Sequence, residues 1–319
     1  MDKPVILISA ICGDIGYSAV RSVRESVSKI IGCDIRSYSP VTHLVDKFYE
    51  VPPASDTESY IDFLKGIIRK ESIQFFLPVS EPEIEAINLM REEFEKRGVK
   101  LLLNSKSILD NFLDKLKTAQ YLESIGIKAP RTVLLIVYDG SFGFPLIVKA
   151  RKGYGSKRLW KVDNLIDLDY IRTKDDGCLI VQEYIGTAEE EYTTGVFSDG
   201  KNISSISFRR KLGPDGTTLE ALLVNESFLN RLSMQIAINT SLVGYINIQS
   251  RRVMDIFVPF EINPRISGTV LFRKAFGFDD IIWWINVLLG KRYCYKPLYK
   301  SGRAIRYYSE SYFDMEKII

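Results

Sequence analysis

The runs Gly244-Tyr-Ile-Asn-Ile-Gln249 and Pro259-Phe-Glu-Ile-Asn-Pro-Arg265 carry the strongest chemical signal in this sequence. Residues i and i+2 of a β-strand face the same side, so Glu261 and Asn263 share one face. Pairing of the two runs would bring Gln249 to the same point. Oxygen ligands of this kind suit Mg²⁺, which also keeps water molecules and binds phosphate oxygens. The pattern predicts a magnesium site on paired strands, and the alternative is a solvated strand face that ends at a proline.

Basic and glycine-rich segments accompany this candidate metal site. Arg265 follows the proline that ends the strand, and a guanidinium beside the metal can hold a transferring phosphoryl group. Upstream, Lys149 ends the apolar run 144–149, and the glycine-rich stretch 152–157 comes next. Glycines let the backbone approach phosphate closely, and N–H groups and lysines bind it. The stretch does not match the P-loop pattern, and a hairpin turn is the alternative interpretation.

Another apolar strand, Cys178-Leu-Ile-Val-Gln-Glu-Tyr-Ile185, ends in polar groups. Such an edge can hydrogen-bond an adenine through its backbone and a carboxylate. Glu191 follows eight residues after Glu183, and a carboxylate there can accept hydrogen bonds from ribose hydroxyls. Since Glu189 and Glu190 adjoin it, an acidic surface turn is the alternative.

Together and in this order, these runs resemble the ATP-grasp superfamily. The greatest likeness is to the synthetase halves of the carbamoyl-phosphate synthetase large subunit and to single-chain ligases similar to them. The run 244–249 resembles that family's G-P-x-N-x-Q motif, with Tyr245 in place of the proline, and Glu261 to Thr269 resembles its E-I-N-P-R-x-S-G block. The resemblance covers nearly the whole chain. It implies an α/β plus α+β fold, in which an N-terminal parallel pre-ATP-grasp domain precedes a two-lobed ATP-grasp unit with antiparallel sheets.

The resemblance also implies a role for individual residues. Magnesium, with Mn²⁺ as an alternative, would be bound by Gln249, Glu261 and Asn263, while Arg265 would hold phosphate or acyl phosphate. The residues implied to bind ATP are Lys115, Lys149, Gly153, Gly155, Ser156, Gln182, Glu183, Tyr184, Ile185 and Glu191.

The basic cluster 209–211 does not look like the carbamoyl enzyme. The corresponding region faces the acceptor substrate in the family, so we expect a different substrate here. Arg209 or Lys211 is a candidate for contacting it, which hints at an acidic substrate. A basic hairpin closed by a Pro-Asp-Gly turn is the alternative.

Strand and helix patterns divide the chain in two. Short apolar runs alternate with helical patterns over residues 1–105, which indicates a parallel α/β sheet. From residue 203 to 265 the strands are longer and alternate between polar and apolar residues, as in an antiparallel sheet. We expect a pre-ATP-grasp domain over 1–105 and an ATP-grasp domain over 106–319. The latter would hold a small lid over about 130–187 and a C-terminal lobe over 188–319.

Composition narrows the class of protein. The 319-residue chain has 43 lysines and arginines against 40 acidic residues, a formal net charge of +3, which does not indicate a nucleic-acid-binding protein. Its single histidine, His43, nearly excludes a histidine zinc site or a Ser-His-Asp triad. The four cysteines form no C-x-x-C pair, and the N-terminus lacks the long apolar segment of a signal peptide. We therefore expect a cytoplasmic protein that binds neither nucleic acid nor membrane.

A rival interpretation rests on the N-terminal turn. Gly13 and Gly16 lie between a strand and a helix, and Asp34 follows about 20 residues later, as in a dinucleotide-binding oxidoreductase. That fingerprint needs three glycines, and only two are present. A tight strand–helix turn is the favoured interpretation.

The resemblance implies an ATP-grasp enzyme, an ATP-dependent carboxylate–amine ligase. A carboxylate would attack the γ-phosphorus of Mg·ATP to give an acyl phosphate and ADP, and an amine would then expel phosphate and form an amide. The expected partners are ATP and small-molecule carboxylate and amine substrates. Family members are often dimers, so a homodimer is compatible with this expectation. An alternative within the fold stops at phosphorylation, as in a carbamate or carboxylate kinase.

Overall fold

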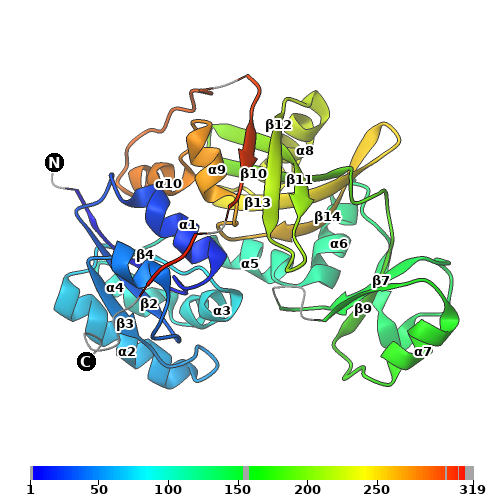
Figure 1. The fold of residues 1–319 in the computed structure, drawn as a ribbon, viewed down its shortest axis with the longest axis horizontal. Coiled ribbons are helices and arrows are strands. Elements are labelled where there is room, and N and C mark those ends of the chain that lie inside the picture. Colours follow the sequence, from blue (N-terminus) through cyan, green and yellow to red (C-terminus); the bar gives the residue numbers. More distant parts are fainter. Residues whose placement is uncertain (1–2, 154–157, 299, 308, 313–319) are drawn as a thin grey trace.

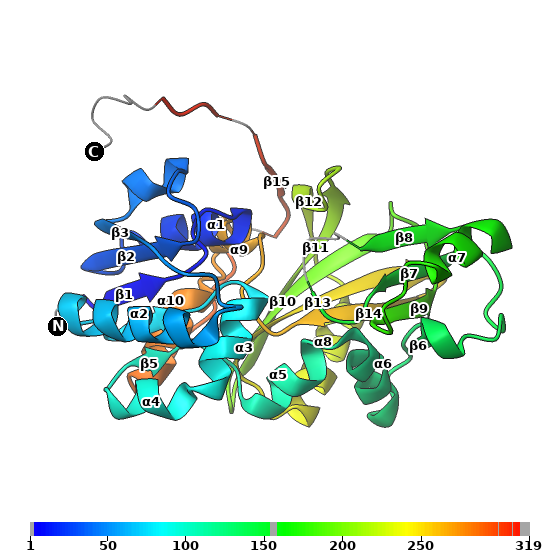
Figure 2. The same ribbon diagram turned by 90° about the horizontal axis from the view of Figure 1, so that it is seen from below.

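The computed structural model describes residues 3–153, 158–298, 300–307 and 309–312. Its described strands form three sheets, which have five, four and six strands. In Figures 1 and 2 the six-stranded sheet lies between the five-stranded sheet on one side and the four-stranded sheet on the other. The α/β plus α+β class predicted from the sequence is confirmed.

The five-stranded sheet is parallel throughout, in the order β3-β2-β1-β4-β5. Ile6, Leu7 and Ile8 of its central strand are all fully buried, because helices cover both faces of a parallel sheet. The N-terminal elements are β1 (Val5–Ile8), α1 (Asp14–Val23), β2 (Lys29–Asp34), a 3-10 turn (Pro40–Leu44), β3 (Lys47–Glu50), α2 (Thr57–Glu71), β4 (Phe75–Leu77), α3 (Glu81–Leu89), α4 (Arg91–Lys96) and β5 (Lys100–Leu101).

The four-stranded sheet is small and antiparallel, in the order β6-β9-β7-β8. One helix covers it, and the core between them is formed by buried aliphatic side chains such as Val148, Val162 and Leu168. Two short helices lead into this unit from the N-terminal sheet. The elements are α5 (Lys106–Phe112), α6 (Lys115–Ser124), β6 (Thr132–Leu134), a 3-10 turn (Leu135–Val137), β7 (Leu146–Ala150), β8 (Leu159–Val162), α7 (Leu165–Arg172) and β9 (Leu179–Glu183).

The six-stranded sheet is antiparallel, in the order β14-β13-β10-β11-β12-β15. One face carries Val196, Ile246 and Ile248, which pack with the buried side chains of α8. The elements are β10 (Glu191–Asp199), β11 (Ile203–Leu212), β12 (Thr218–Val224), α8 (Ser227–Asn239), β13 (Val243–Val253), β14 (Ile256–Asn263), α9 (Val270–Ala275), α10 (Asp280–Leu288) and β15 (Arg303–Ile305).

The opposite face of this sheet is divided between core and site. Phe197 and Tyr245 at one end join a large apolar cluster with α1, α9 and α10. Toward the other end of the same strands the side chains become polar, and there they line a cavity. Across the described residues, no helix has the length and apolar character needed to span a membrane.

Candidate active site

A cavity of about 630 Å³ lies where the three sheets meet. Lys149 on β7 and Gln182 on β9 line it from the lid, and Glu261 on β14 lines it from the large sheet. Glu81 at the start of α3 lines it from the N-terminal unit. Every layer of the fold therefore contributes side chains to one site.

The register of β13 and β14 explains why oxygen ligands converge. The two strands pair antiparallel, with Gln249 opposite Glu261 and Asn247 opposite Asn263. Opposed residues of an antiparallel pair point to the same face. The structure thus brings Gln249, Glu261 and Asn263 together in the cavity, in the arrangement predicted from the spacing of the two runs.

Glu261 is the carboxylate at the centre of this group. Its Oε1 accepts a hydrogen bond from Asn263 Nδ2 at 3.1 Å, and its Oε2 lies 3.9 Å from Lys149 Nζ. Burial opposes ionisation, but the charges of Lys115 and Lys149 and the bond from Asn263 outweigh it and lower the pKa of Glu261. Among the residues that the structure describes, no three His, Cys, Asp or Glu side chains cluster closely enough to hold a metal ion by themselves. An ionised Glu261, with the side-chain amide of Asn263 next to it, suits Mg²⁺ that takes its remaining ligands from phosphate and water.

Two lysines flank the carboxylate. Asp114 caps α6 and pairs with Arg151, which fixes the start of the helix from which Lys115 projects. Lys115 Nζ donates to the Gly153 carbonyl at 2.8 Å, so it reaches the start of the glycine-rich stretch. Gly153 has a φ of +115°, a conformation that side chains other than glycine rarely adopt. Two further candidate residues in the stretch, Gly155 and Ser156, lie outside the described residues.

Lys149 is buried, with 4% of its surface exposed. Burial lowers its pKa to about 8, and the nearby carboxylate of Glu261 offsets this only in part. The affinity for Mg·ADP should therefore fall as the pH rises above 8, because a neutral amine no longer attracts phosphate. For one linked proton the limiting slope is about tenfold per pH unit. Titration calorimetry from about pH 7 to 9.5 would measure it, and Lys149→Arg, which stays charged, should flatten the profile. A steep profile in the arginine variant would contradict this assignment.

The segment predicted to bind adenine lies at the end of the lid strand β9. Gln182, Glu183 and Ile185 line the cavity, whereas Tyr184 is not among the lining residues. The side chain of Gln182 is held by Thr132, to which it donates at 2.9 Å. The segment thus reaches the cavity through three of its four predicted residues, and adenine binding there stays a prediction.

Arg210 is a site residue that the sequence interpretation missed. Tyr192 pairs with Arg209 in the sheet, so Glu191 and Arg210 both project from the opposite face, into the cavity. Arg209, in contrast, pairs with Glu190 at 3.4 Å and is 46% exposed in its side chain.

Neither Arg209 nor Lys211 lines the cavity. The basic cluster does send one member into the site, and it is the middle one because strand residues alternate.

Arg210 also forms hydrogen bonds with two residues that were predicted to bind ligands, Glu191 and Gln249. Its guanidinium donates to Glu191 Oε1 at 2.7 Å and to Gln249 Oε1 at 3.0 Å. Arg251 donates to the other oxygen of Glu191 at 2.9 Å. Both carboxylate oxygens of Glu191, predicted to bind ribose, are therefore engaged, as is the oxygen of Gln249. In the predicted ligand roles, Glu191 and Gln249 would share these oxygens with the arginines.

Arg265 ends the Glu-Ile-Asn-Pro-Arg run at the boundary with the N-terminal unit. It lies 3.3 Å from Glu81 Oε1 and donates to the Ile266 carbonyl at 3.2 Å. Asn104, after β5, donates to the Pro264 carbonyl at 2.9 Å and so ties the neighbouring backbone to the N-terminal unit. Arg265 is thus held at the cavity wall from both sides.

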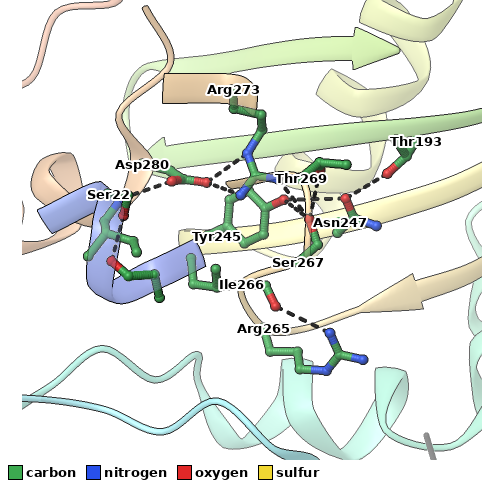
Figure 3. Close-up of polar contacts among 12 residues, drawn as sticks. Ser22, Thr193, Tyr245, Asn247, Arg265, Ile266, Ser267, Thr269, Arg273 and Asp280 are labelled. Atoms are coloured by element: carbon green, nitrogen blue, oxygen red, sulfur yellow. Dashed lines mark hydrogen bonds and ion pairs between the residues drawn. The ribbon is translucent and has the colours of Figure 1, made fainter. Parts of the chain in front are cut away.

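A buried polar network supports this wall from behind (Figure 3). Arg273 is fully buried, pairs with Asp280 at 2.5 Å and donates to Ser267 and Thr269 at 2.7 Å each. Tyr245 stacks against its guanidinium, with 4.6 Å from the ring centroid to Cζ.

The same network reaches Asn247, which lines the cavity. Its Oδ1 accepts from Thr193 at 2.9 Å and from the Tyr245 hydroxyl at 3.3 Å, so its amide NH₂ is the group left for a ligand. Tyr245, which replaces the proline of the motif that residues 244–249 resemble, therefore orients a cavity residue.

The N-terminal turn has a different explanation from a dinucleotide site. Asp34 accepts from the Cys12 amide of the turn at 2.8 Å and from the Arg36 amide after β2 at 3.0 Å, so both of its oxygens have backbone partners. A Cβ on Gly16 would lie 2.3 Å from the Ala10 carbonyl oxygen. The glycine allows close helix–strand packing. Structural roles therefore account for Gly16 and Asp34, the residues that suggested a dinucleotide site.

Comparison with known proteins agrees with this geometry. Residues 7–102 match the family model of the PylC-like N-terminal domain, and residues 176–310 match that of ATP-grasp in the biosynthetic pathway with Ter operon. The large chain of carbamoyl phosphate synthase from Thermoanaerobacter sp. is 28% identical over 240 residues, covering 68% of this chain and 22% of its own length. The Campylobacter jejuni large chain is 22% identical over 211 residues, covering 58% and 19%. The chain therefore spans about a fifth of the length of these relatives.

Solved structures share the fold. A biotin carboxylase from Campylobacter jejuni has a TM-score of 0.71 at 20% identity, covering 92% of this chain and 72% of its own. The N5-carboxyaminoimidazole synthetase of Staphylococcus aureus, complexed with ADP, has a TM-score of 0.74 at 16% identity, covering 95% and 83%. An L-amino acid ligase from Bacillus licheniformis has a TM-score of 0.68 at 16% identity, covering 90% and 75%. Sequence block, fold and family models agree: residues 176–310 match an ATP-grasp family model, and the chain resembles the large chain of carbamoyl phosphate synthase.

Proposed function

We propose that this protein is an ATP-dependent carboxylate–amine ligase that forms an amide through an acyl phosphate and releases ADP and phosphate. The observation that carries the proposal is the meeting of Glu261, Asn263, Lys149 and Arg265 in one cavity that also reaches the end of β9. In this set, Glu261 and Asn263 can bind a metal ion. Lys149 and Arg265 can bind phosphate. It fits phosphoryl transfer, in which positioning and charge neutralisation do most of the work.

Each group has a part in the proposed reaction. The edge at Gln182, Glu183 and Ile185 binds adenine, and Lys115 and Lys149 bind phosphate oxygens. Glu261 and Asn263 would hold Mg²⁺, which would neutralise phosphate charge when bound.

Arg265 stabilises the phosphoryl group during transfer to the substrate carboxylate. Support for nucleotide binding comes from the Staphylococcus aureus neighbour, whose structure holds ADP.

The proposal keeps the division of the chain predicted from sequence. The five-stranded sheet falls within 1–105, the four-stranded sheet within 130–187 and the six-stranded sheet within 188–319. We assign them to the pre-ATP-grasp domain, the lid and the C-terminal lobe. A homodimer stays a prediction.

The proposed chemistry is tested by trapping the activated acid. The protein is incubated with Mg·ATP, hydroxylamine and a panel of carboxylates that includes the twenty amino acids, and hydroxamate and ADP are measured. We expect hydroxamate and ADP in equal amounts with at least one acid, and neither without magnesium. Release of AMP in place of ADP, or ATP hydrolysis that no carboxylate stimulates, would contradict acyl phosphate formation.

A further inference from the structure

We propose that Asp14, at the start of α1, binds the ammonium group of the amine substrate. This inference rests on the ligase function proposed above, and it names the charge of the acceptor. Asp14 lines the same cavity as Glu261 and Arg265 but comes from the opposite end of the chain. No role in nucleotide or metal binding was predicted for it.

Six carboxylates line the cavity, and Asp14 differs from the rest. Within the described part of the chain, its side chain has no hydrogen bond or ion pair, whereas each of the others has a partner. The pairs are Glu81 with Arg265, Glu183 with Arg131, Glu191 with Arg210 and Arg251, Asp215 with Thr217, and Glu261 with Asn263.

The position of Asp14 places its charge next to the reacting centre. A Cβ on Gly268 would lie 2.6 Å from Asp14 Oδ2, so the carboxylate lies directly against the backbone three residues after Arg265. Arg306 is the nearby cation, but it donates to the carbonyls of Gly268 at 2.8 Å and Thr218 at 3.3 Å. The absence of a side chain at Gly268 leaves room for the Asp14 carboxylate, and the neighbouring Arg306 forms no ion pair with it.

The end of the cavity near α1 is the part to which neither ATP nor the metal ion is assigned, and it can therefore take the amine substrate. Adenine is assigned to the end of β9 on the lid, and the phosphates to Lys115, Lys149 and Arg265. In Figures 1 and 2, α1 and the lid lie on opposite sides of the large sheet. A substrate seated beside Asp14 would therefore approach Arg265 from the side opposite to ATP.

The chemistry of a free carboxylate at this point favours a cation. A primary amine is protonated near neutral pH, and a partly buried ammonium needs a carboxylate to offset its loss of water. The bound ammonium then loses one proton to solvent or phosphate before its nitrogen attacks the acyl carbon and expels phosphate. The basic side chains of Arg209 and Lys211, which hinted at an acidic acceptor, do not line the cavity. Asp14 also suits the positive end of the helix dipole, and that purely structural role is the interpretation to be tested against.

The test compares charged and uncharged nucleophiles in the Asp14→Asn variant. With the acid found by hydroxamate trapping, amide formation is measured with the twenty amino acids and glycinamide as amines. Hydroxylamine, which is uncharged at about pH 8, reports acyl phosphate formation. Glu25→Gln, which removes a carboxylate from the exposed segment just after α1, is the matched control. Unfolding midpoints of all variants verify that they fold.

For Asp14→Asn we expect kcat/KM for the amine to fall about 10- to 100-fold, mostly through KM. Hydroxamate formation should stay within about twofold, and Asp14→Glu should recover part of the loss. An unchanged KM for the amine in a folded Asp14→Asn variant would overturn the inference. A wild type that makes hydroxamate but accepts no charged amine would also overturn it. Absence of hydroxamate in the wild type is a different result, which would count against the ligase function itself.

Discussion

Glu261→Gln should lose about a hundred- to a thousandfold in ATP turnover while its fold is preserved. The substitution keeps the size of the side chain and a group that can hydrogen-bond Asn263, but removes the negative charge. Glu261 is the carboxylate among the three predicted metal ligands, so nothing else in that set can replace its charge. The change also takes the counter-charge from Lys149, whose ammonium lies 3.9 Å away.

Turnover is measured as ADP released with the acid identified by trapping. Glu190→Gln is the control, since Glu190 projects from the other face of the sheet, where it contacts Arg209 and Tyr192. Its turnover should match the wild type. ATP turnover by Glu261→Gln at the wild-type rate would show that the metal assignment is wrong.

Arg273→Met should lower the free energy of unfolding by about 3–5 kcal/mol, because it leaves a buried carboxylate without its partner. Arg273 and Asp280 have side-chain exposures of 0% and 1%, so water cannot replace the lost interaction. Ser267 and Thr269 would each lose a hydrogen bond from the guanidinium as well. Urea unfolding followed by circular dichroism would measure the change.

The exposed ion pair between Arg24 and Asp46 provides the comparison, with 37% exposure on each side chain. Arg24→Met should cost less than about 1 kcal/mol, since exposed pairs contribute little. Changing Arg273 and Asp280 together to apolar residues should recover part of the stability, because the unpaired charge is then gone. Equal losses in Arg24→Met and Arg273→Met would contradict the importance given to burial.

Strand periodicity was enough to predict the centre of the site. The spacing of Glu261 and Asn263 places them on one face in any strand, and pairing of adjacent runs is the usual arrangement in an antiparallel sheet. The parallel N-terminal sheet also follows from local patterns, since its short apolar runs alternate with helical segments. These features depend on neighbours close in sequence.

The partners of the site residues could not be predicted in the same way. Arg210 reaches Glu191 and Gln249 only because β10 lies between β11 and β13 in a particular register. Strand alternation would have separated Arg210 from Arg209 and Lys211 once that register was known.

The contacts behind the site between residues far apart in sequence could not be predicted either. Tyr245 contacts Arg273, 28 residues later, and Asp14 meets Gly268 across almost the whole chain. Such contacts are set by how the layers pack, and no local pattern encodes them. The contact of Asp14 with Gly268 is the one that supports the proposed acceptor site.

Stabilisation of the wild-type protein by Mg·ADP is the most direct test of the nucleotide site. Thermal unfolding is followed with ADP and magnesium, with ADP and a chelator, and with NAD. A ligand that binds only the folded state contributes about 2.7 kcal/mol at 100 times its Kd. We predict a rise in the unfolding temperature with Mg·ADP, a smaller rise without magnesium, and none with NAD. A rise with NAD alone would contradict the assignment of this cavity to ATP and magnesium.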